Sequence, residues 1–411
     1  MMKKNNILAI TLLGGFVLLA AGCVKEADMN DMYRPEGSPI IFTAATGYEN
    51  GDGTRTEYSG EYYDNLGNQV TGSTLSSYAN SWERIDWVNN DPVTIYYKHP
   101  DNSSTNAGYT VSNKTANDEN SDATIQVASG STKLTWAGGS GNHIFTAMYP
   151  TSGFGGNSNC SFNGTTATGR IPSSQTLRLG NGKYLPQMQY AYLAARMTIQ
   201  GTSTDRTVYL PFNPAYTAFE FRLKRPATLQ NGSTASFKVK SFSITSTSNL
   251  AGDFSLTIDG ENAKGATWSN TPTVTNGSHT VSVTFNGNTG VALSTSSELV
   301  FTLLALPIDI DNLTLTLTFA DTGNTTKSIQ LKDSSNQPKS FAACKKYIIT
   351  NSNAGFDDWE YIVDPIADIT TYGHDAASGN FEVHSYRVSK ADNSIKQAVP
   401  WKIQYSLNSD L

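Results

Sequence analysis

The chain has few residues that could form a metal site. Its five histidines lie at positions 99, 143, 279, 374 and 384, and its three cysteines lie at positions 23, 160 and 344. A zincin-type pattern needs two histidines close together on one helix, and a structural zinc site needs closely spaced cysteines. Neither spacing occurs in the sequence. We therefore predict no metal site and no cofactor.

Patterns for nucleophilic and phosphate-transfer chemistry are incomplete. The run Gly138–Asn142 resembles a hydrolase nucleophile turn but ends in asparagine where glycine is required. Lys183 follows Gly182 as in a phosphate-binding loop, yet the first glycine and the following Ser or Thr are missing. The acidic loop Asp118–Asp122 lacks the ligand order of an EF-hand and is interpreted as a solvated loop. We predict that the chain is not an enzyme.

One cysteine lies where it could be covalently modified. Two lysines at positions 3 and 4 precede the apolar run Ile7–Ala21, which ends in small residues before Cys23. The run is shorter than the ~20 apolar residues of a membrane-spanning helix, so residues 1–22 are predicted to be a signal peptide. The junction resembles the lipobox of bacterial lipoproteins, with Ala20 where leucine is usual.

The lipobox resemblance implies cleavage before Cys23 and attachment of palmitate-type acyl chains to this cysteine. Each buried CH₂ group contributes ~0.8 kcal/mol, so two or three chains would anchor the protein firmly in a membrane. The alternative is an ordinary signal peptide followed by an incidental cysteine. Residues 23–38 are polar and without periodicity, and are predicted to be a flexible tether.

The composition is typical of an extracellular β-protein. Only 16% of the 411 residues are charged, and the formal net charge is −6. Nucleic-acid binding needs clustered Lys and Arg, so nucleic acid is not an expected partner. After Cys23, the two remaining cysteines, Cys160 and Cys344, allow at most one disulfide, and the sequence leaves open whether they pair.

Alternating apolar and polar residues predict β-strands through most of the chain. The first candidate is 39–45. Others lie at 93–98, 123–128, 132–136, 143–149, 218–224, 237–244, 299–306 and 313–319. The segment 189–199 alone has a helix-friendly composition. In 237–244 the apolar residues change from odd to even positions, which would turn them to the other face of a regular strand. This change predicts a bulge near Ser241. Leu299–Leu306 is apolar on both faces and is expected to be a central strand.

These patterns predict an all-β chain built mainly of β-sandwiches. Polar residues at 202–206 mark the expected boundary between an N-terminal sandwich, 39–204, and a C-terminal sandwich, 205–351. The final segment, 356–411, is interpreted as a partial third β-domain or a C-terminal extension, because domains below ~70 residues rarely form a sufficient core. Its abrupt end at Leu411 leaves truncation of the chain open.

The order and spacing of several short motifs resemble those of the fimbrillins, the type V pilins of Bacteroidetes-type bacteria, including the Mfa-like fimbrillins. The resemblance covers about residues 1–351, and Asn90 and Cys344 stand where that family commonly has glycine. The segments that carry it are 40–42, 54–56, 87–96, 147–150, 171–175, 249–254, 306–307, 313–319 and 341–347.

The resemblance implies two tandem transthyretin-like β-sandwiches in a structural or adhesive fimbrial protein. In that family a trypsin-like protease cuts beyond the first strand, and a strand from a neighbouring subunit fills the groove. On this chain the implied processing site is Arg55, because the other candidate, Arg34, precedes proline. The alternative is that Arg55 is a solvated turn residue and not a processing site. The alternating run Trp401, Ile403 and Tyr405 is the candidate donor strand.

The expected partners are other fimbrial subunits, the outer membrane through the lipid, and host or bacterial surface ligands. The expected location is the cell outer membrane, as a surface-exposed lipoprotein, or the fimbrium. A glycan-binding surface lipoprotein is the main alternative, because 10% of the residues are aromatic and exposed rings can stack on sugars. A glycoside hydrolase is the less favoured alternative, since it needs only two suitably separated carboxylates.

Overall fold

The computed structural model describes residues 36–46, 57–63, 70, 82–112, 123–224, 238–262, 265–268, 271–294, 296–320, 324, 326–332, 335–351, 359–365, 383–389 and 396–398. Over these residues the fold is all-β, as predicted. The helical segments described are single 3-10 turns: η3 (Phe154–Gly156), η4 (Met188–Tyr190) and η5 (Asn286–Asn288). None of the described helices has the length and hydrophobicity needed to cross a bilayer.

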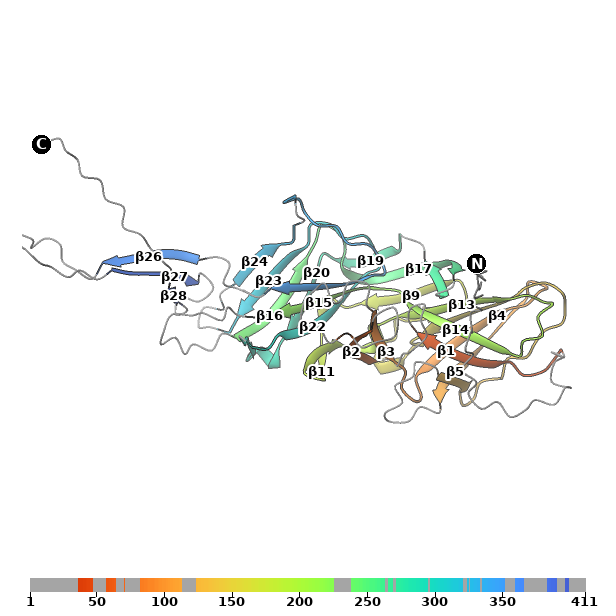
Figure 1. The fold of residues 1–411 in the computed structure, drawn as a ribbon. Coiled ribbons are helices and arrows are strands. Elements are labelled where there is room, and N and C mark those ends of the chain that lie inside the picture. Colours follow the sequence, from red (N-terminus) through yellow and green to blue (C-terminus); the bar gives the residue numbers. More distant parts are fainter. Residues whose placement is uncertain are drawn as a thin grey trace, which may run out of the picture.

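Seven strands close into a barrel that contains the first strand of the chain (Figure 1). Strand β1 pairs in parallel with β14 and antiparallel with β6, which completes the ring. In barrel order the strands are β1 (Ile41–Thr46), β14 (Thr207–Pro214), β13 (Leu193–Ile199), β7 (His143–Tyr149), β4 (Pro92–Lys98), β5 (Ser104–Ser112) and β6 (Ala123–Val127).

The barrel interior is filled by aromatic side chains. In β4, Val93, Ile95 and Tyr97 are buried and alternate with more exposed residues, which confirms the predicted half-buried strand. The Tyr97 ring stacks on Phe145 with centroids 4.6 Å apart, and Trp136 meets Phe145 edge-on at 5.5 Å. Such offset and edge-to-face pairs add to the stabilisation from buried area.

Two further sheets pack face to face as a sandwich. One contains β10 (Ser174–Gln175), β20 (Thr280–Thr284), β16 (Lys238–Thr245), β23 (Thr314–Phe319) and β24 (Thr326–Gln330), with β21 (Val291–Ala292) also paired to β16. The other contains β11 (Leu177–Gly180), β12 (Lys183–Pro186), β22 (Leu299–Ala305), β15 (Thr217–Leu223) and β25 (Lys346–Asn351). Phe242 of the first sheet lies 4.5 Å from Phe221 and 4.8 Å from Phe301 of the second, measured between ring centroids.

Several expectations for these strands are confirmed. The pairing of β16 with β23 shifts register between Val239 and Ser241, where the bulge was predicted. All seven residues of β22 are buried, and β23 alternates between buried leucines and half-buried threonines. One expectation is wrong: the segment 132–136 is not a strand and contributes a single bridge, Thr135 to Pro39. The segment 189–199, which has a helix-friendly composition, forms η4 and β13.

A third sheet joins the barrel to the sandwich. The long strand β17 (Ala251–Asn262) pairs with β9 (Thr166–Ile171), β18 (Gly265–Trp268) and β19 (Thr273–Ser278), and β9 also pairs with β8 (Ser161–Phe162). Strand pairing therefore crosses residue 205 in both directions, since β9 pairs with β17 and β14 closes the barrel. The division into two domains at that residue stays a prediction.

Two small groups of strands complete the description. Strand β2 (Glu57–Tyr63) pairs with β3 (Trp82–Asp86). Near the C-terminus, β26 (Trp359–Pro365), β27 (Val383–Ser389) and β28 (Lys396–Ala398) form an antiparallel sheet, which Figure 1 places at the opposite end from the barrel. That residues 356–411 form part of a third β-domain stays a prediction.

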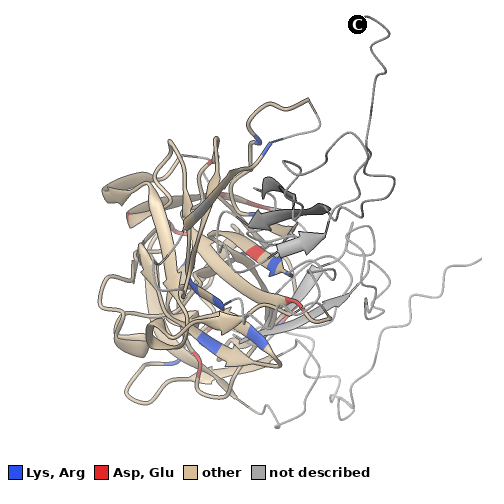
Figure 2. Ribbon diagram, turned by 90° about the vertical axis from the view of Figure 1, so that its left-hand side faces the viewer, with Lys and Arg blue, Asp and Glu red and all other residues tan. Residues whose placement is uncertain are grey.

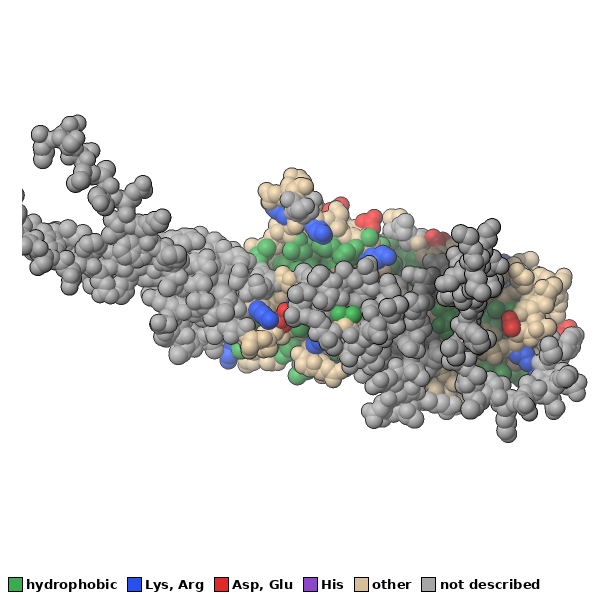
Figure 3. Space-filling model, viewed as in Figure 1, with side chains coloured by type: hydrophobic (Ala, Val, Ile, Leu, Met, Phe, Trp, Pro, Cys, Tyr) green, Lys and Arg blue, Asp and Glu red, His purple; other side chains and the backbone are tan. Residues whose placement is uncertain are grey.

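Charged residues are spread over the surface. Figure 2 shows Lys, Arg, Asp and Glu positions scattered singly over strands and loops of the described part. In Figure 3, hydrophobic side chains reach the surface over the sandwich, with basic side chains beside them. The low charge of the sequence thus leaves much of the described surface to neutral residues.

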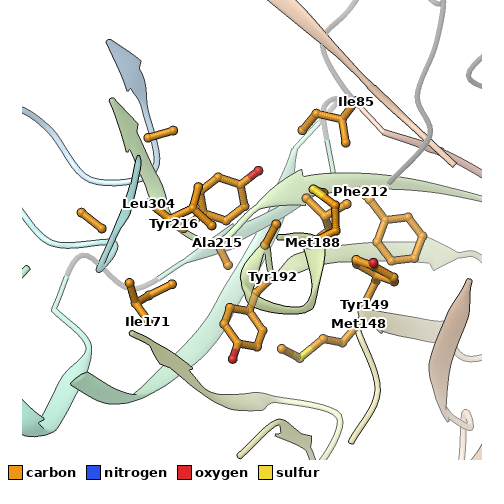
Figure 4. Packing of buried hydrophobic residues seen from close by; sticks show 14 of the residues in the cluster. Ile85, Met148, Tyr149, Ile171, Met188, Tyr192, Phe212, Ala215, Tyr216 and Leu304 are labelled. Carbon is orange, nitrogen blue, oxygen red and sulfur yellow. The ribbon is translucent and has the colours of Figure 1, made fainter. Parts of the chain in front are cut away.

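The core is continuous from barrel to sandwich. One cluster of buried residues extends from Ile40 in front of β1 to Phe341 in front of β25. At the junction, Figure 4 shows Met148, Tyr149 and Phe212 of the barrel near Tyr192 and Ala215, with Tyr216 and Leu304 beyond them. Because the packed region is unbroken, barrel and sandwich are held as one body.

Candidate functional site

Strand β1 supplies one wall of the barrel. Side chains alternate along a strand, so Ile40, Phe42 and Ala44 point inward and are at most 1% exposed, while Ile41 points outward and is 52% exposed. The Phe42 ring lies edge-on to Tyr109 at 5.2 Å and to Phe145 at 5.6 Å. Without β1, an apolar slot and the edges of β6 and β14 would be exposed.

The predicted modification and processing residues lie outside the described residues. This applies to the proposed lipidation site Cys23, to the proposed cleavage site Arg55, and to the candidate donor residues Trp401, Ile403 and Tyr405. The structure does define what flanks Arg55: β1 ends at Thr46 and β2 begins at Glu57. Cleavage after Arg55 would therefore fall between two strands and separate β1 from the rest of the chain.

A pocket of about 170 Å³ lies on the outer wall of the barrel. It is formed by β4, β7, β13, the start of β5 and the turn between β8 and β9. Its lining residues are Tyr96, Lys98, Ser104, Ile144, Thr146, Asn163, Gly164, Thr165 and Arg196. No carboxylate belongs to this lining, so the pocket does not have the paired acids of a glycosidase.

The β8–β9 turn is fastened to the barrel by hydrogen bonds. The hydroxyl of Tyr96 donates to the Phe162 carbonyl at 2.5 Å, and the hydroxyl of Thr146 donates to the Gly164 carbonyl at 2.7 Å. Gly164 has a φ of 95°, and a Cβ at this position would lie 3.0 Å from the Tyr96 ring. Only glycine suits both this backbone conformation and this close approach.

Two basic side chains line the pocket. Arg196 forms an ion pair with Glu261, with Nε to Oε2 at 3.3 Å, and Glu261 also accepts hydrogen bonds from the Thr198 backbone and hydroxyl. Lys98 makes no ion pair or side-chain hydrogen bond with any described residue. The sequence does not predict this pocket, because the lining residues come from five segments that only the fold brings together.

The two cysteines do not form a disulfide. The Cys160 thiol is buried and donates to the Pro150 carbonyl, with Sγ to O at 2.9 Å, and burial raises its pKa to about 12. Burial also raises the pKa of Cys344 to about 12. A nucleophilic cysteine needs a lowered pKa, so neither thiol is suited to catalysis.

Strand β15 alternates apolar and charged residues, and its charged residues Glu220 and Arg222 are buried. Glu220 accepts from Nε and Nη2 of Arg222, both at 2.7 Å, and its other oxygen lies 3.0 Å from Nζ of Lys346 on β25. Every residue of β15 is buried, on both faces of the strand. The reason is that β15 lies inside its sheet, where β25 brings a lysine to compensate the carboxylate.

No family model and no curated protein matches the chain. Its structure is similar to that of a candidate cell adhesion protein from Bacteroides uniformis, at 15% identity and a TM-score of 0.42, over 86% of this chain and 98% of that one. A candidate cell adhesion protein from Bacteroides ovatus is similar at 14% identity and a TM-score of 0.42, over 77% and 93% of the two chains.

A fimbrial assembly protein from Parabacteroides distasonis is also similar, at 9% identity and a TM-score of 0.32, over 87% of this chain and 98% of that one. These solved proteins are described as cell adhesion or fimbrial assembly proteins. Because the identities and TM-scores are low, the functional proposal is based on the residues of this chain.

Proposed function

We propose that the chain is a lipid-anchored, surface-exposed fimbrial subunit with an adhesive role, which joins other subunits by strand exchange. The observation that carries the proposal is the position of β1. It is the first described strand, it lies close to the proposed lipid anchor in sequence, and it fills a slot between β6 and β14. Such a slot suits an incoming strand, which would satisfy both free edges and bury alternate apolar side chains.

Processing would convert the anchored precursor into a polymerising subunit. Cleavage after Arg55 would separate the acylated Cys23 and β1 from the remaining chain, leaving a new N-terminus at Thr56, directly before β2. The C-terminal run with Trp401, Ile403 and Tyr405 has the alternation that the slot requires. A subunit that keeps its lipid would act as an anchor in the outer membrane.

N-terminal sequencing of protein sheared from cells tests the processing step. Material that begins at Thr56 is the expected result. A blocked N-terminus at Cys23 in every surface form would exclude cleavage at Arg55. Deleting residues 400–411 tests the donor, because polymers should then no longer form.

A reversible cross-link tests the exchange itself. Thr43 of β1 and Thr124 of β6 are directly paired in antiparallel register, a separation that a disulfide can span. The double substitution Thr43→Cys and Thr124→Cys should retain β1 and prevent polymerisation under oxidising conditions, and a reductant should restore it. Thr43→Cys alone is the matched control. Polymers that assemble normally with β1 cross-linked would rule out strand exchange at this slot.

A glycan-binding role is the second candidate function, and the pocket beside Tyr96 is the observation that favours it. The pocket joins an aromatic ring to hydroxyl, amide and basic side chains. Such a combination suits a sugar, and its lack of lining carboxylates does not support the glycoside hydrolase alternative.

A further inference from the structure

We propose that the pocket formed by β4, β7, β13 and the β8–β9 turn binds one carboxylated sugar unit of a surface glycan. The inference deepens the adhesive part of the proposed function by naming a ligand class for it. It depends on neither the lipid nor strand exchange, since all the residues that line the pocket lie on the described barrel and the turn fastened to it.

The size and floor of the pocket suit a single ring. Its volume of about 170 Å³ is below the ~300–1,000 Å³ of typical drug-sized sites. Tyr96 and Ile144, which we call the floor, are the large apolar side chains of the lining, and both are half-buried. The C–H face of a pyranose can pack on such a floor while its hydroxyl groups point to the rim, which an inorganic anion cannot do.

Neutral polar groups around the floor can bond to sugar hydroxyls. The side-chain oxygen of Asn163 already accepts from the Thr165 and Thr166 backbone amides and the Thr165 hydroxyl. Its amide nitrogen makes no hydrogen bond with the described residues and remains available as a donor. Ser104 adds a hydroxyl that can donate or accept.

The charges of the pocket favour a ligand with one carboxylate. Glu261 offsets Arg196, while Lys98 has no described partner, so the group of three carries one net positive charge. A single carboxylate would neutralise this charge. A neutral sugar would make only a neutral acceptor available to Lys98, and a hydrogen bond between two charged groups contributes more.

The site is held in place before any ligand arrives. Tyr96, Lys98, Ile144, Thr146 and Arg196 all lie on barrel strands. The turn that completes the pocket is fixed by hydrogen bonds from Tyr96 and Thr146. Sites on rigid strands lose little entropy on binding.

Binding of defined monosaccharides tests the proposal. The soluble chain 24–411 would be titrated with methyl glycosides of glucuronic acid, galacturonic acid and N-acetylneuraminic acid, and binding followed by NMR or calorimetry. Methyl glucoside and methyl galactoside are the neutral matches, and inorganic phosphate is the simple anion. We expect at least one acidic glycoside to bind at least about tenfold more tightly than the neutral glycosides, which corresponds to ~1.4 kcal/mol, and more tightly than phosphate.

Charge reversal identifies the site. Lys98→Glu should reduce acidic-glycoside affinity at least about tenfold. Lys339→Glu, the same change at an exposed lysine outside the pocket, should leave it unchanged. Lys98 is exposed, so both variants should unfold at the temperature of the parent chain. The proposal is overturned if no acidic glycoside binds, if neutral glycosides bind equally well, if phosphate binds better, or if Lys98→Glu has no effect. Polymerisation of the parent chain is measured separately. A negative result with the glycosides would therefore leave the strand-exchange proposal standing.

Discussion

The side-chain amide of Gln175 binds both backbone groups of Leu304, 129 positions further along the chain. Its Nε2 donates to the Leu304 carbonyl at 2.7 Å, and its Oε1 accepts from the Leu304 N–H at 3.0 Å. Gln175 belongs to the short strand β10 of one sandwich sheet, while Leu304 belongs to β22 of the other. The Gln175 side chain thus ties its own sheet to the backbone of the other sheet.

Replacing this amide should destabilise the sandwich. Gln175→Ala would leave the buried N–H and carbonyl of Leu304 without these partners, at a cost of ~1–3 kcal/mol in the free energy of unfolding. Chemical denaturation followed by tryptophan fluorescence measures this change. Gln126→Ala, at an exposed position of β6, is the matched control and should change stability by less than ~0.5 kcal/mol. Equal effects of the two changes would contradict the role given to Gln175.

The buried carboxylate of Glu220 should be more sensitive than a surface one. Glu220→Gln would remove the carboxylate charge that contacts buried Arg222 and half-buried Lys346, and we expect the free energy of unfolding to fall by ~3–5 kcal/mol. Glu298 is the control, since it lies 3.9 Å from Lys224 and is more exposed. Glu298→Gln should cost ~0–1 kcal/mol. A small effect at Glu220 would show that the charges are compensated in another way.

Titration of the Cys160 thiol should lower the free energy of unfolding as the pH becomes alkaline. Burial raises its pKa from the ordinary value of 9.0 to about 12, so the folded state holds the proton more tightly than the unfolded state. The stabilisation is complete below pH 9.0 and is lost as the pH rises toward about 12, because the unfolded chain deprotonates first.

Cys160→Ala removes this contribution. Between about pH 8 and about pH 10.5 the parent chain 24–411 should lose more stability than the variant. Denaturation of both proteins at each pH isolates the thiol, since all other titrating groups are shared. Parallel pH profiles would contradict the assignment.

Two residues occupy left-handed backbone conformations at positions where the fimbrillins, which the sequence resembles, commonly have glycine. Asn90 has a φ of 71° and Cys344 a φ of 53°. Asparagine tolerates this region, whereas other side chains lose ~1–2 kcal/mol there. Cys344→Gly should therefore stabilise the chain by about 1 kcal/mol, and Asn90→Gly should have a smaller effect. Thermal unfolding compares them, and destabilisation by Cys344→Gly would be the contrary result.

The inward and outward faces of β1 should contribute differently to the free energy of unfolding. Phe42→Ala removes a ring packed on Tyr109 and Phe145 and should cost ~3–5 kcal/mol of stability. Ile41→Ala, on the outward face of the same strand, should cost less than ~0.5 kcal/mol. Denaturation of both soluble chains tests this. If strand exchange occurs, Phe42→Ala should also release β1 more readily and speed polymerisation.

Local patterns in the sequence predicted much of the fold. The alternation in Val93–Tyr97, the threonine face of β23 and the bulge near Ser241 are properties of a single strand and its immediate neighbours. The segment 132–136 also alternates, yet it finds one bridge partner only. Which strands pair depends on the packing of the whole chain, and the alternation of residues within one strand does not determine it.

The positions of Glu220 and of the pocket depend on such nonlocal choices. The alternation around Glu220 is typical of a half-solvated strand, but β25, more than 120 positions later, covers its edge and supplies Lys346. The pocket likewise joins residues from position 96 to position 196. Closure of the barrel by β14 could not be read from residue types, because a parallel pairing between distant segments leaves no local signature.

The parallel contact between β1 and β14 also sets an order of events during biogenesis. Ile41 pairs with Thr207, so a chain that emerges from a translocation pore N-terminus first cannot close its barrel until the residues of β14 have followed. Contacts between distant segments form slowly, and unpaired strand edges promote aggregation in the meantime. If the chain is exported as proposed, it would therefore pass through a form with open strand edges, and a chaperone that covers such edges would favour correct closure.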